Sequence, residues 1–244
     1  MTRYDLDVSV RGQMMDDSFA VEALARCPLF ENASQEMLES LANRLRRRRF
    51  RRNEVIFHQG DPGDSLHVVA SGAVKILLPS AEGEEAIIAT LRPGDFFGEL
   101  ALLDGATRSA TAAAVEPTET LTLPRPVLID LLATIPGLGD RLLVGLAKEL
   151  RRLTSQVEEL YFLDLAGRLA MRLTRLAEEA QPDTRGQIRL NWPYTQSDLA
   201  AMIGGTRQSV NKLLAQLVDD GFIQIQPDEL IITDLDALAR RAER

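Results

Sequence analysis

The chain has 244 residues, of which 45% are hydrophobic, so it is long enough for two domains that each bury a core. Its longest apolar stretch, residues 121–132, is broken by Pro124, Arg125, Pro126 and Asp130, so we expect neither a transmembrane helix nor a membrane partner. The formal net charge of −8 excludes a protein that coats nucleic acid with its whole surface, but it permits a local DNA-reading face.

Residues 1–18 mix acidic and basic side chains and are predicted to form a flexible tail. They lack the continuous apolar core of a secretory signal, so we expect a cytoplasmic protein. Two short amphipathic helices are predicted next, at residues 21–29 and 35–45. Cys27 is the single cysteine and is interpreted as a structural thiol. One cysteine and two histidines give little support to a metal site, although a haem bound through a histidine stays open.

Residues 44–52 contain seven arginines, interrupted by Leu45 and Phe50. Such a run can bind polyanions such as nucleic acid or anionic lipid. We favour a solvated connection between a helix and a strand, because Phe50, Val55 and Phe57 resemble core anchors that would leave the arginines in water. The role of the run is left open.

Short runs of β-branched and apolar residues follow between residues 55 and 123, among them 66–70, 74–78 and 86–91. Glycines stand where tight turns with a positive φ would connect these runs. The spacing predicts an antiparallel barrel or roll. The turn glycines are Gly60, Gly63, Gly72, Gly83 and Gly94.

Residues 97–111 read FGELALLDGATRSAT and are the most informative stretch of the chain. Gly98 would let the backbone approach a ligand, and a short helix from Glu99 would direct free N–H groups at an anion. Arg108 supplies the planar fork that pairs with two phosphate oxygens, and Ser109 adds a hydroxyl donor. The Glu99 carboxylate suits a ribose 2′-hydroxyl. Singly, Glu99 could cap a helix and Arg108 could form a surface ion pair, but together the residues favour a cyclic phosphate site.

Beyond Pro136 the sequence predicts a long helix that reaches at least to Phe162. Its apolar residues recur at intervals of three and four, which is the spacing of a coiled-coil seam. A stripe that packs on the chain's own core is the alternative. Charged residues flank the narrow apolar line, so we favour pairing between two subunits. The stripe comprises Leu143, Leu146, Leu150, Leu153, Val157 and Leu160.

A further helix is predicted at residues 163–180, after a domain junction at 162–164. Pro182 and Asp183 indicate a loop at 181–186. Two more helices follow, and residues 221–232 read as a small β-hairpin with a Pro-Asp turn.

Residues 195–214 read as two helices joined at Gly204 and Gly205. The second helix begins after Thr206 and carries polar, hydrogen-bonding residues opposite its apolar side. Such a face is typical of a recognition helix that enters the major groove. An ordinary solvated helix face is the alternative, but the hairpin that follows favours DNA binding. The base-reading candidates are Arg207, Gln208, Asn211 and Lys212, and the phosphate-contact candidates are Thr195, Ser197 and Thr206.

These motifs resemble those of the cyclic AMP receptor protein/fumarate-nitrate regulator (CRP/FNR) superfamily of transcription regulators. The resemblance extends from about residue 22 to residue 235 and includes VIFHQGDPGD at 55–64, Ser71-Gly72, the FGEL and RSA segments of the phosphate-binding cassette, and the FLD that ends the long helix. Within the superfamily this cassette marks members that bind cyclic nucleotides, since redox and haem members usually lack its Glu and Arg. The resemblance carries the ligand site over to Gly98, Glu99, Leu100, Ala101, Arg108 and Ser109.

The resemblance implies an α+β fold with four parts. Residues 1–18 form the tail, and 19–135 an N-terminal double-stranded β-helix (jelly-roll) that binds a cyclic nucleotide. Residues 136–164 form a dimerisation helix, and 165–244 a C-terminal winged helix-turn-helix that binds DNA.

Two places depart from the family pattern. Members that bind cyclic AMP commonly carry a Thr-Ser or Thr-Asn pair for adenine in the long helix, whereas Leu153 and Thr154 stand here, and of these Thr154 alone could bond a base. In the recognition helix Gln208 replaces a glutamate and Lys212 replaces an arginine, so we expect an altered base preference. Cyclic AMP is favoured as the ligand, while cyclic GMP, cyclic di-GMP, haem, a redox signal and ligand independence stay open.

The sequence thus predicts a homodimeric transcription regulator that binds double-stranded DNA at palindromic operators under allosteric control by cyclic AMP, with RNA polymerase as a further implied partner. An enzyme controlled by the roll is the main rival from another class. Residues 165–244 show no nucleophile, metal cluster or glycine-rich phosphate loop, so we expect neither catalysis nor a metal. A non-catalytic module that pairs through its long helix is the third alternative, and DNA binding would exclude it.

Overall fold

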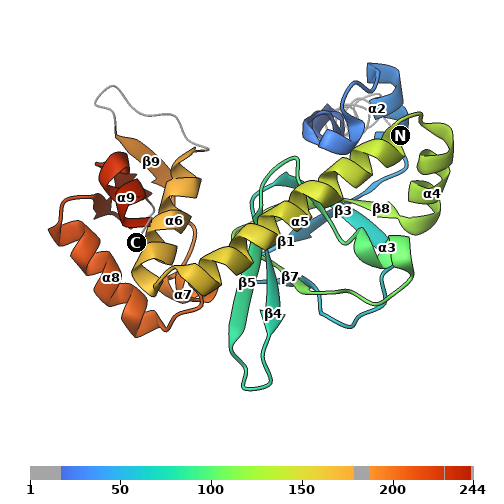
Figure 1. Cartoon of the computed structure of the whole chain (residues 1–244). Helices are drawn as coiled ribbons and strands as arrows, with labels where there is room; N and C mark the ends of the chain where they lie inside the picture. Colours follow the sequence, from blue (N-terminus) through green and yellow to red (C-terminus); the bar gives the residue numbers. More distant parts are fainter. Residues whose placement is uncertain (1–17, 179–186, 228, 243–244) are drawn as a thin grey trace, which may run out of the picture. The chain divides into compact units, whose positions relative to one another are not determined.

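A computed structural model describes residues 18–178, 187–227 and 229–242 (Figure 1). The chain forms two compact units, one of residues 1–78 and 88–149 and one of residues 79–87 and 150–244. Apart from Ser18, the predicted tail lies outside the described residues, as does the whole predicted loop at 181–186.

Two four-stranded sheets build the first unit, with the strand orders β1-β8-β3-β6 and β2-β7-β4-β5. Apart from β4 and β5, which are consecutive in the chain, strands adjacent in a sheet come from distant parts of the sequence. The pairs β1–β8, β3–β8, β3–β6, β2–β7 and β4–β7 are antiparallel. This is the roll that the glycine spacing predicted. The strands are β1 (Arg46–Phe50), β2 (Val55–Phe57), β3 (Ser65–Ser71), β4 (Val74–Pro79), β5 (Glu85–Leu91), β6 (Phe96–Phe97), β7 (Thr111–Ala114) and β8 (Thr118–Pro124).

Strand β3 is covered on both faces, which explains why its sequence is apolar almost without alternation. Val69 on one face joins a core between the two sheets, with Phe97 and Ala112. Leu66 and Val68 on the other face join a larger core against the helices. These helices are residues 18–26, the 3₁₀ helix η1 (Pro28–Phe30), α2 (Gln35–Ala42), α4 (Arg125–Thr134) and the start of α5 (Leu138–Phe162).

The interpretation of the arginine run as a connection is wrong for residues 46–50, which form the edge strand β1. Phe50 is buried as expected, but Val55 is 39% exposed and is not a core anchor.

The helix predicted at residues 21–29 ends earlier, at residue 26. The chain turns at Cys27 and restarts as η1 at Pro28, because proline has no backbone N–H to continue an α-helix.

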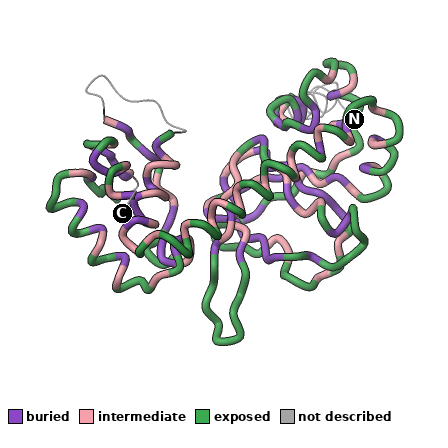
Figure 2. The backbone as a smooth tube through the Cα atoms, viewed as in Figure 1, coloured by how far each residue is buried: buried purple, intermediate pink, exposed green. Residues whose placement is uncertain are grey.

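Helix α5 has 25 residues and confirms the predicted long helix. Four residues of its apolar stripe are exposed: Leu143 (65%), Leu150 (66%), Val157 (52%) and Leu160 (56%). Figure 2 shows much of this helix as exposed or intermediate. The stripe is therefore not buried in the chain's own core.

The second unit packs four helices and a three-stranded antiparallel sheet of order β10-β11-β9 around one core. Helix α6 begins two residues later than predicted, because the Asp164 carboxylate accepts a hydrogen bond from the Gly167 N–H at 2.7 Å and so caps it. The predicted hairpin is present as β10 and β11, whereas β9 and α9 were not predicted. The elements are α6 (Leu165–Glu178), β9 (Ile188–Asn191), α7 (Gln196–Ile203), α8 (Arg207–Asp219), β10 (Ile223–Ile225), β11 (Glu229–Ile232) and α9 (Leu235–Ala242).

Candidate functional site

Arg108 lies at the centre of the candidate ligand site in the first unit, and it is only 4% exposed. Its Nη1 donates to the Gly98 carbonyl oxygen at 2.8 Å, and its Nη2 donates to Ser65 Oγ at 3.5 Å. The guanidinium carbon lies 4.2 Å from the centroid of the Phe57 ring. Segments that are far apart in the sequence thus hold one cation between them.

Gly98 leaves the room that this cation needs. Its φ is +84°, which residues with a side chain rarely adopt, and an added Cβ would lie 2.5 Å from Arg108 Nη1. Gly63 leaves room for helix α3 (Leu100–Asp104) in the same way, because a Cβ on Gly63 would overlap the Cβ of Ala101. Larger residues at either position would displace the groups that form the site.

The Arg108 guanidinium retains capacity for a further partner. Its Nε forms no hydrogen bond with any described residue. The carboxylate that faces it, Asp64 Oδ1, is 3.7 Å from Nη2 and belongs to an exposed side chain. Burial lowers the pKa of Arg108, while Asp64, Glu99 and Asp61 raise it. An anion that accepts from such a buried donor would stabilise it.

Glu99 is half-buried and immediately precedes α3. Burial raises the pKa of its carboxyl group, as does Glu149, whereas a hydrogen bond from its own backbone and the charge of Arg108 lower it. Leu100 is 43% exposed and Ala101 is buried. Ser109 is exposed. The structure therefore joins Gly98 and Arg108 by direct contact and leaves the Ser109 hydroxyl at the surface.

Three aromatic rings line the interior next to Arg108. His67 is stacked on Phe97 with the ring centroids 5.0 Å apart, and Phe57 lies within 5.9 Å of both. His67 Nδ1 is 3.1 Å from Thr120 Oγ1. Burial lowers the pKa of His67 to about 4, and the charges of Arg108 and Arg48 act in the same direction. His67 is therefore neutral near pH 7.

Thr154, the predicted base-contact residue, lies on α5 in the second unit. It is exposed, and its hydroxyl donates to the Leu150 carbonyl oxygen at 2.9 Å, a bond within the helix. Leu153 beside it is half-buried.

Helices α7 and α8 form the predicted helix-turn-helix in the second unit. Thr195 and Asp198 cap α7 reciprocally, each side chain bonding to the backbone N–H of the other. Gly204 ends α7 with a φ of +67°, and a Cβ on Gly205 would lie 2.7 Å from Leu165 Cδ1. The turn therefore packs tightly on α6.

Helix α8 presents the predicted polar face to solvent. Thr206 caps its start by accepting from the Ser209 N–H at 3.2 Å. Val210, Leu214 and Leu217 are buried on the core side. All of the predicted DNA contacts are exposed: Thr195, Ser197, Thr206, Arg207, Gln208, Asn211 and Lys212.

Comparison with known proteins bears on both units. Residues 47–135 match the family model of the cyclic nucleotide-binding domain, and residues 167–241 match that of the Crp-like helix-turn-helix domain. The chain is 33% identical over 221 residues to the CRP-like cAMP-activated global transcriptional regulator of Mycobacterium tuberculosis, which covers 91% of this chain and 99% of that protein. The chain belongs to the CRP/FNR family of transcription regulators.

Two further relatives agree with this assignment. The cyclic AMP receptor protein of Thermus thermophilus is 34% identical over 200 residues, which cover 82% of this chain and 89% of that protein. A solved CRP/FNR family transcriptional regulator of the same species superposes with a TM-score of 0.67 at 29% identity, and covers 82% of this chain and 99% of that one.

As a member of the CRP/FNR family, the chain is a DNA-binding transcription regulator with a cyclic nucleotide-binding domain, and not an enzyme. Among the residues that the structure describes, no helix is long and apolar enough to span a membrane, and no group of three or more His, Cys, Asp or Glu could hold a metal ion.

Sequence reasoning missed Phe57, Ser65 and His67 as neighbours of the CRP/FNR cassette. Ser65 and His67 are two residues apart on β3, so they share the face that contains Val69. Phe57 directly precedes the HQGD segment of the family motif. The alternation along β3 was the available signal, but the apolar character of the whole strand hid it.

Proposed function

We propose that this CRP/FNR regulator is a homodimer that cyclic AMP controls and that reads palindromic operators. The observation that carries the proposal is the buried Arg108 whose Nε has no partner among the described residues. The relatives support cyclic AMP, since one is named a cAMP-activated regulator and another a cyclic AMP receptor protein.

The residues present suit a cyclic nucleotide. Phosphate oxygens would accept from Arg108 and from the hydroxyl of Ser109. Gly98, Leu100 and Ala101 form the turn and the start of α3 that the phosphate would approach. The Glu99 carboxylate would accept from the ribose 2′-hydroxyl, and Thr154 would contact the base.

Leu153 leaves a guanine nucleotide open as the ligand. A leucine cannot exchange hydrogen bonds with a base, so the preference for adenine rests on Thr154 alone. Cyclic GMP and cyclic di-GMP carry a guanine with other hydrogen-bonding edges and are the alternatives to test.

The exposed stripe of α5 supports the homodimer. Leu143, Leu150 and Val157 are seven residues apart, and each is more than half exposed. Burial against a second copy would stabilise the pair by about 1.5–3 kcal/mol for each side chain that becomes fully buried. We propose the boundaries 19–135, 136–164 and 165–244 for the ligand-binding, dimerisation and DNA-binding parts, and a cytoplasmic location.

The DNA-reading role falls to the exposed face of α8. Bases would be read by Arg207, Gln208, Asn211 and Lys212, and phosphates would be contacted by Thr195, Ser197 and Thr206. Two such helices in a dimer would enter successive major grooves about 34 Å apart. Nucleotide would act by binding the DNA-competent arrangement more tightly, and RNA polymerase is the proposed downstream partner.

Calorimetric titration with cyclic AMP, cyclic GMP and cyclic di-GMP tests the ligand. We expect tightest binding of cyclic AMP and at least an about tenfold loss of affinity in Arg108→Leu, since hydrogen bonds to a charged group are broken. Arg26→Leu is the matched control, because Arg26 is an exposed arginine of the same unit. An Arg108→Leu protein that folds and binds as tightly as wild type would exclude the phosphate role.

Sedimentation of Leu150→Glu tests the dimer, and an unchanged mass would contradict the pairing of α5.

A further inference from the structure

Helix α5 packs closely on strand β6 beside the ligand site. Gly145 makes this close packing possible, because a Cβ there would lie 3.0 Å from Phe96 Cζ. Glu149 follows Gly145 by four residues, so the two share one face of the helix. Glu99 follows Phe96 by three residues, just beyond the end of the strand. The helix and the strand thus bring Glu149 to the neighbourhood of Glu99, and its charge acts on the Glu99 carboxyl group.

These two carboxylates are only partly open to water. Glu99 and Glu149 are both half-buried. Burial raises the pKa of Glu99 most, and the charge of Glu149 raises it further, whereas a backbone hydrogen bond and the charge of Arg108 lower it. The cations next to Glu149 on α5 are Lys148, which is exposed, and Arg152, which follows it by three residues. Because partly buried charges are screened less than exposed ones, the repulsion between the two glutamates persists at ordinary salt concentrations.

The ligand site is poor in positive charge for a site that receives an anion. Among the described residues, the charges that act most strongly on it are one buried cation, Arg108, and four carboxylates: Asp61, Asp64, Glu99 and Glu149. Water screens the exposed Asp64, and Asp61 accepts from a backbone N–H of its own loop at 2.8 Å. Glu99 would bind the ribose. Glu149 is therefore the carboxylate of this group that still lacks a role.

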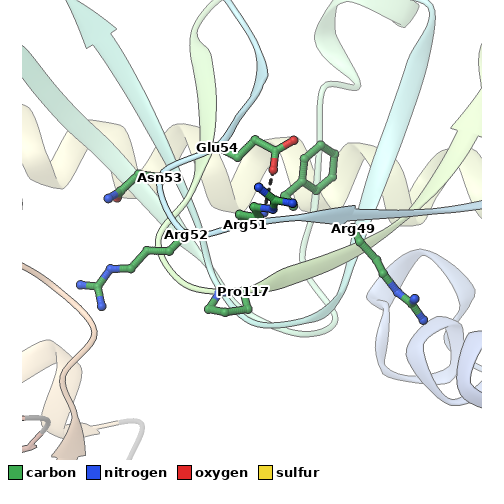
Figure 3. A pocket seen from close by; sticks show the side chains of 7 residues that line it. Arg49, Arg51, Arg52, Asn53, Glu54 and Pro117 are labelled. Atoms are coloured by element: carbon green, nitrogen blue, oxygen red, sulfur yellow. Dashed lines mark hydrogen bonds between the residues drawn. The ribbon is translucent and has the colours of Figure 1, made fainter.

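The arginines that follow β1 do not balance this negative charge. Arg49, Arg51, Arg52 and Pro117 line a shallow hollow, and Figure 3 shows Arg49 and Arg52 pointing to opposite sides of Pro117. These arginines are not among the charges that act most strongly on Glu99. The charge of the ligand site is therefore set by its own acidic residues and by its single buried guanidinium.

We propose that Glu149 limits the affinity of the site for a cyclic nucleotide and couples nucleotide binding to the uptake of a proton by Glu99. The inference rests on the proposed function, because it requires a nucleotide in this site. A cyclic phosphate brings a further negative charge toward the two glutamates. Like charges favour the protonated form of a carboxyl group, and a protonated Glu99 can still exchange a hydrogen bond with the ribose 2′-hydroxyl.

The sign of the pH dependence follows from this repulsion. The bound phosphate makes the pKa of Glu99 higher in the complex than in the free protein, where it is already raised. The complex therefore holds more protons than the free protein over the interval between the two pKa values. Affinity rises as the pH falls through that interval, and it levels off below it.

Calorimetric titration with cyclic AMP, cyclic GMP and cyclic di-GMP, at several pH values from about 8 to about 5.5, tests this coupling. The proteins are the wild-type chain, Glu149→Gln, Glu149→Lys and Asp140→Asn. Asp140 is the matched control, because it is an exposed carboxylate of the same helix. It precedes Glu149 by two and a half helical turns and so lies on the opposite face of α5.

Wild-type affinity should rise at least about threefold over this fall in pH, since up to one proton is taken up with each nucleotide. At about pH 8, Glu149→Gln should bind at least about threefold more tightly than wild type, and Glu149→Lys more tightly still, because a like charge is removed and then reversed. The rise in affinity on acidification should become smaller in the same order. Asp140→Asn should behave as wild type.

Equal affinity of wild type and Glu149→Gln at the alkaline end would overturn the inference, as would a wild-type affinity that does not rise with acidification. Lower affinity in both Glu149 variants would also overturn it, because it would indicate a role in packing. In each of these results the wild type still binds nucleotide, so the proposed function stands. If the wild type binds none of the three nucleotides at any pH, the proposed function and this inference fail together.

Discussion

Gly98→Ala is the most direct perturbation of the candidate ligand site. The added Cβ would lie 2.5 Å from Arg108 Nη1 and 3.3 Å from the Ser65 carbonyl oxygen, and the φ of +84° is strained for alanine. The backbone strain costs about 1–2 kcal/mol and the close contact about 1–3 kcal/mol. Because the side chain that must move is Arg108, we also expect nucleotide affinity to fall at least about tenfold, as broken hydrogen bonds to a charged group predict.

Gly83→Ala is the matched control, because Gly83 has the same φ of +84° but no atom within 4 Å of an added Cβ. Urea denaturation should show a loss of about 1–2 kcal/mol in this variant, and calorimetry should show unchanged nucleotide binding. The reasoning would be refuted if the two variants lost equal stability, or if Gly98→Ala bound nucleotide as tightly as wild type.

Three further outcomes are expected. Because the pKa of His67 is lowered to about 4 from 6.5, the unfolded chain takes up the proton first as the pH falls, so stability should decrease from pH 6.5 to pH 4 by up to about 3 kcal/mol; His67→Gln should flatten this part of the denaturation profile, and an identical profile would contradict the assignment. Burial raises the pKa of Cys27 to about 12, so a disulfide reagent at pH 8 should label the native protein at least about a hundredfold more slowly than the unfolded one, and equal labelling rates would be inconsistent with a buried thiol. Arg207→Ala should reduce the preference for operator over random duplex by about 1–3 kcal/mol in competition binding, and unchanged discrimination would remove Arg207 from base reading.

Local chemistry in the sequence was enough to assign Gly98 and Arg108 to one candidate anion site, although it did not predict the hydrogen bond between them. Gly98 and Arg108 are ten residues apart in one turn-rich segment, and their residue types alone indicate an anion site. The helix-turn-helix was predictable for the same reason, because its caps at Thr195 and Thr206 and the glycine turn between them are local signals.

The rest depended on pairing between distant segments. Strand β1 could not be distinguished from a connection, because arginine at nearly every position hides the alternation, and its partner β8 lies about seventy residues further on. Ser65 reaches Arg108 only because β3 enters the sheet between β8 and β6. Helix α4 was missed because Pro126 and Asp130 were used to exclude a membrane span, whereas a proline in the first helical turn is compatible with a helix.

The buried ring of His67 and the guanidinium of Arg108 both keep a constant charge inside the roll over the pH range of cells. His67 loses its proton at a pH far below that of cells, and a guanidinium keeps its proton to a pH far above it. Neither group changes state when the intracellular pH drifts by a unit. The electrostatic field that these two groups create inside the roll therefore stays constant when a cell acidifies slightly.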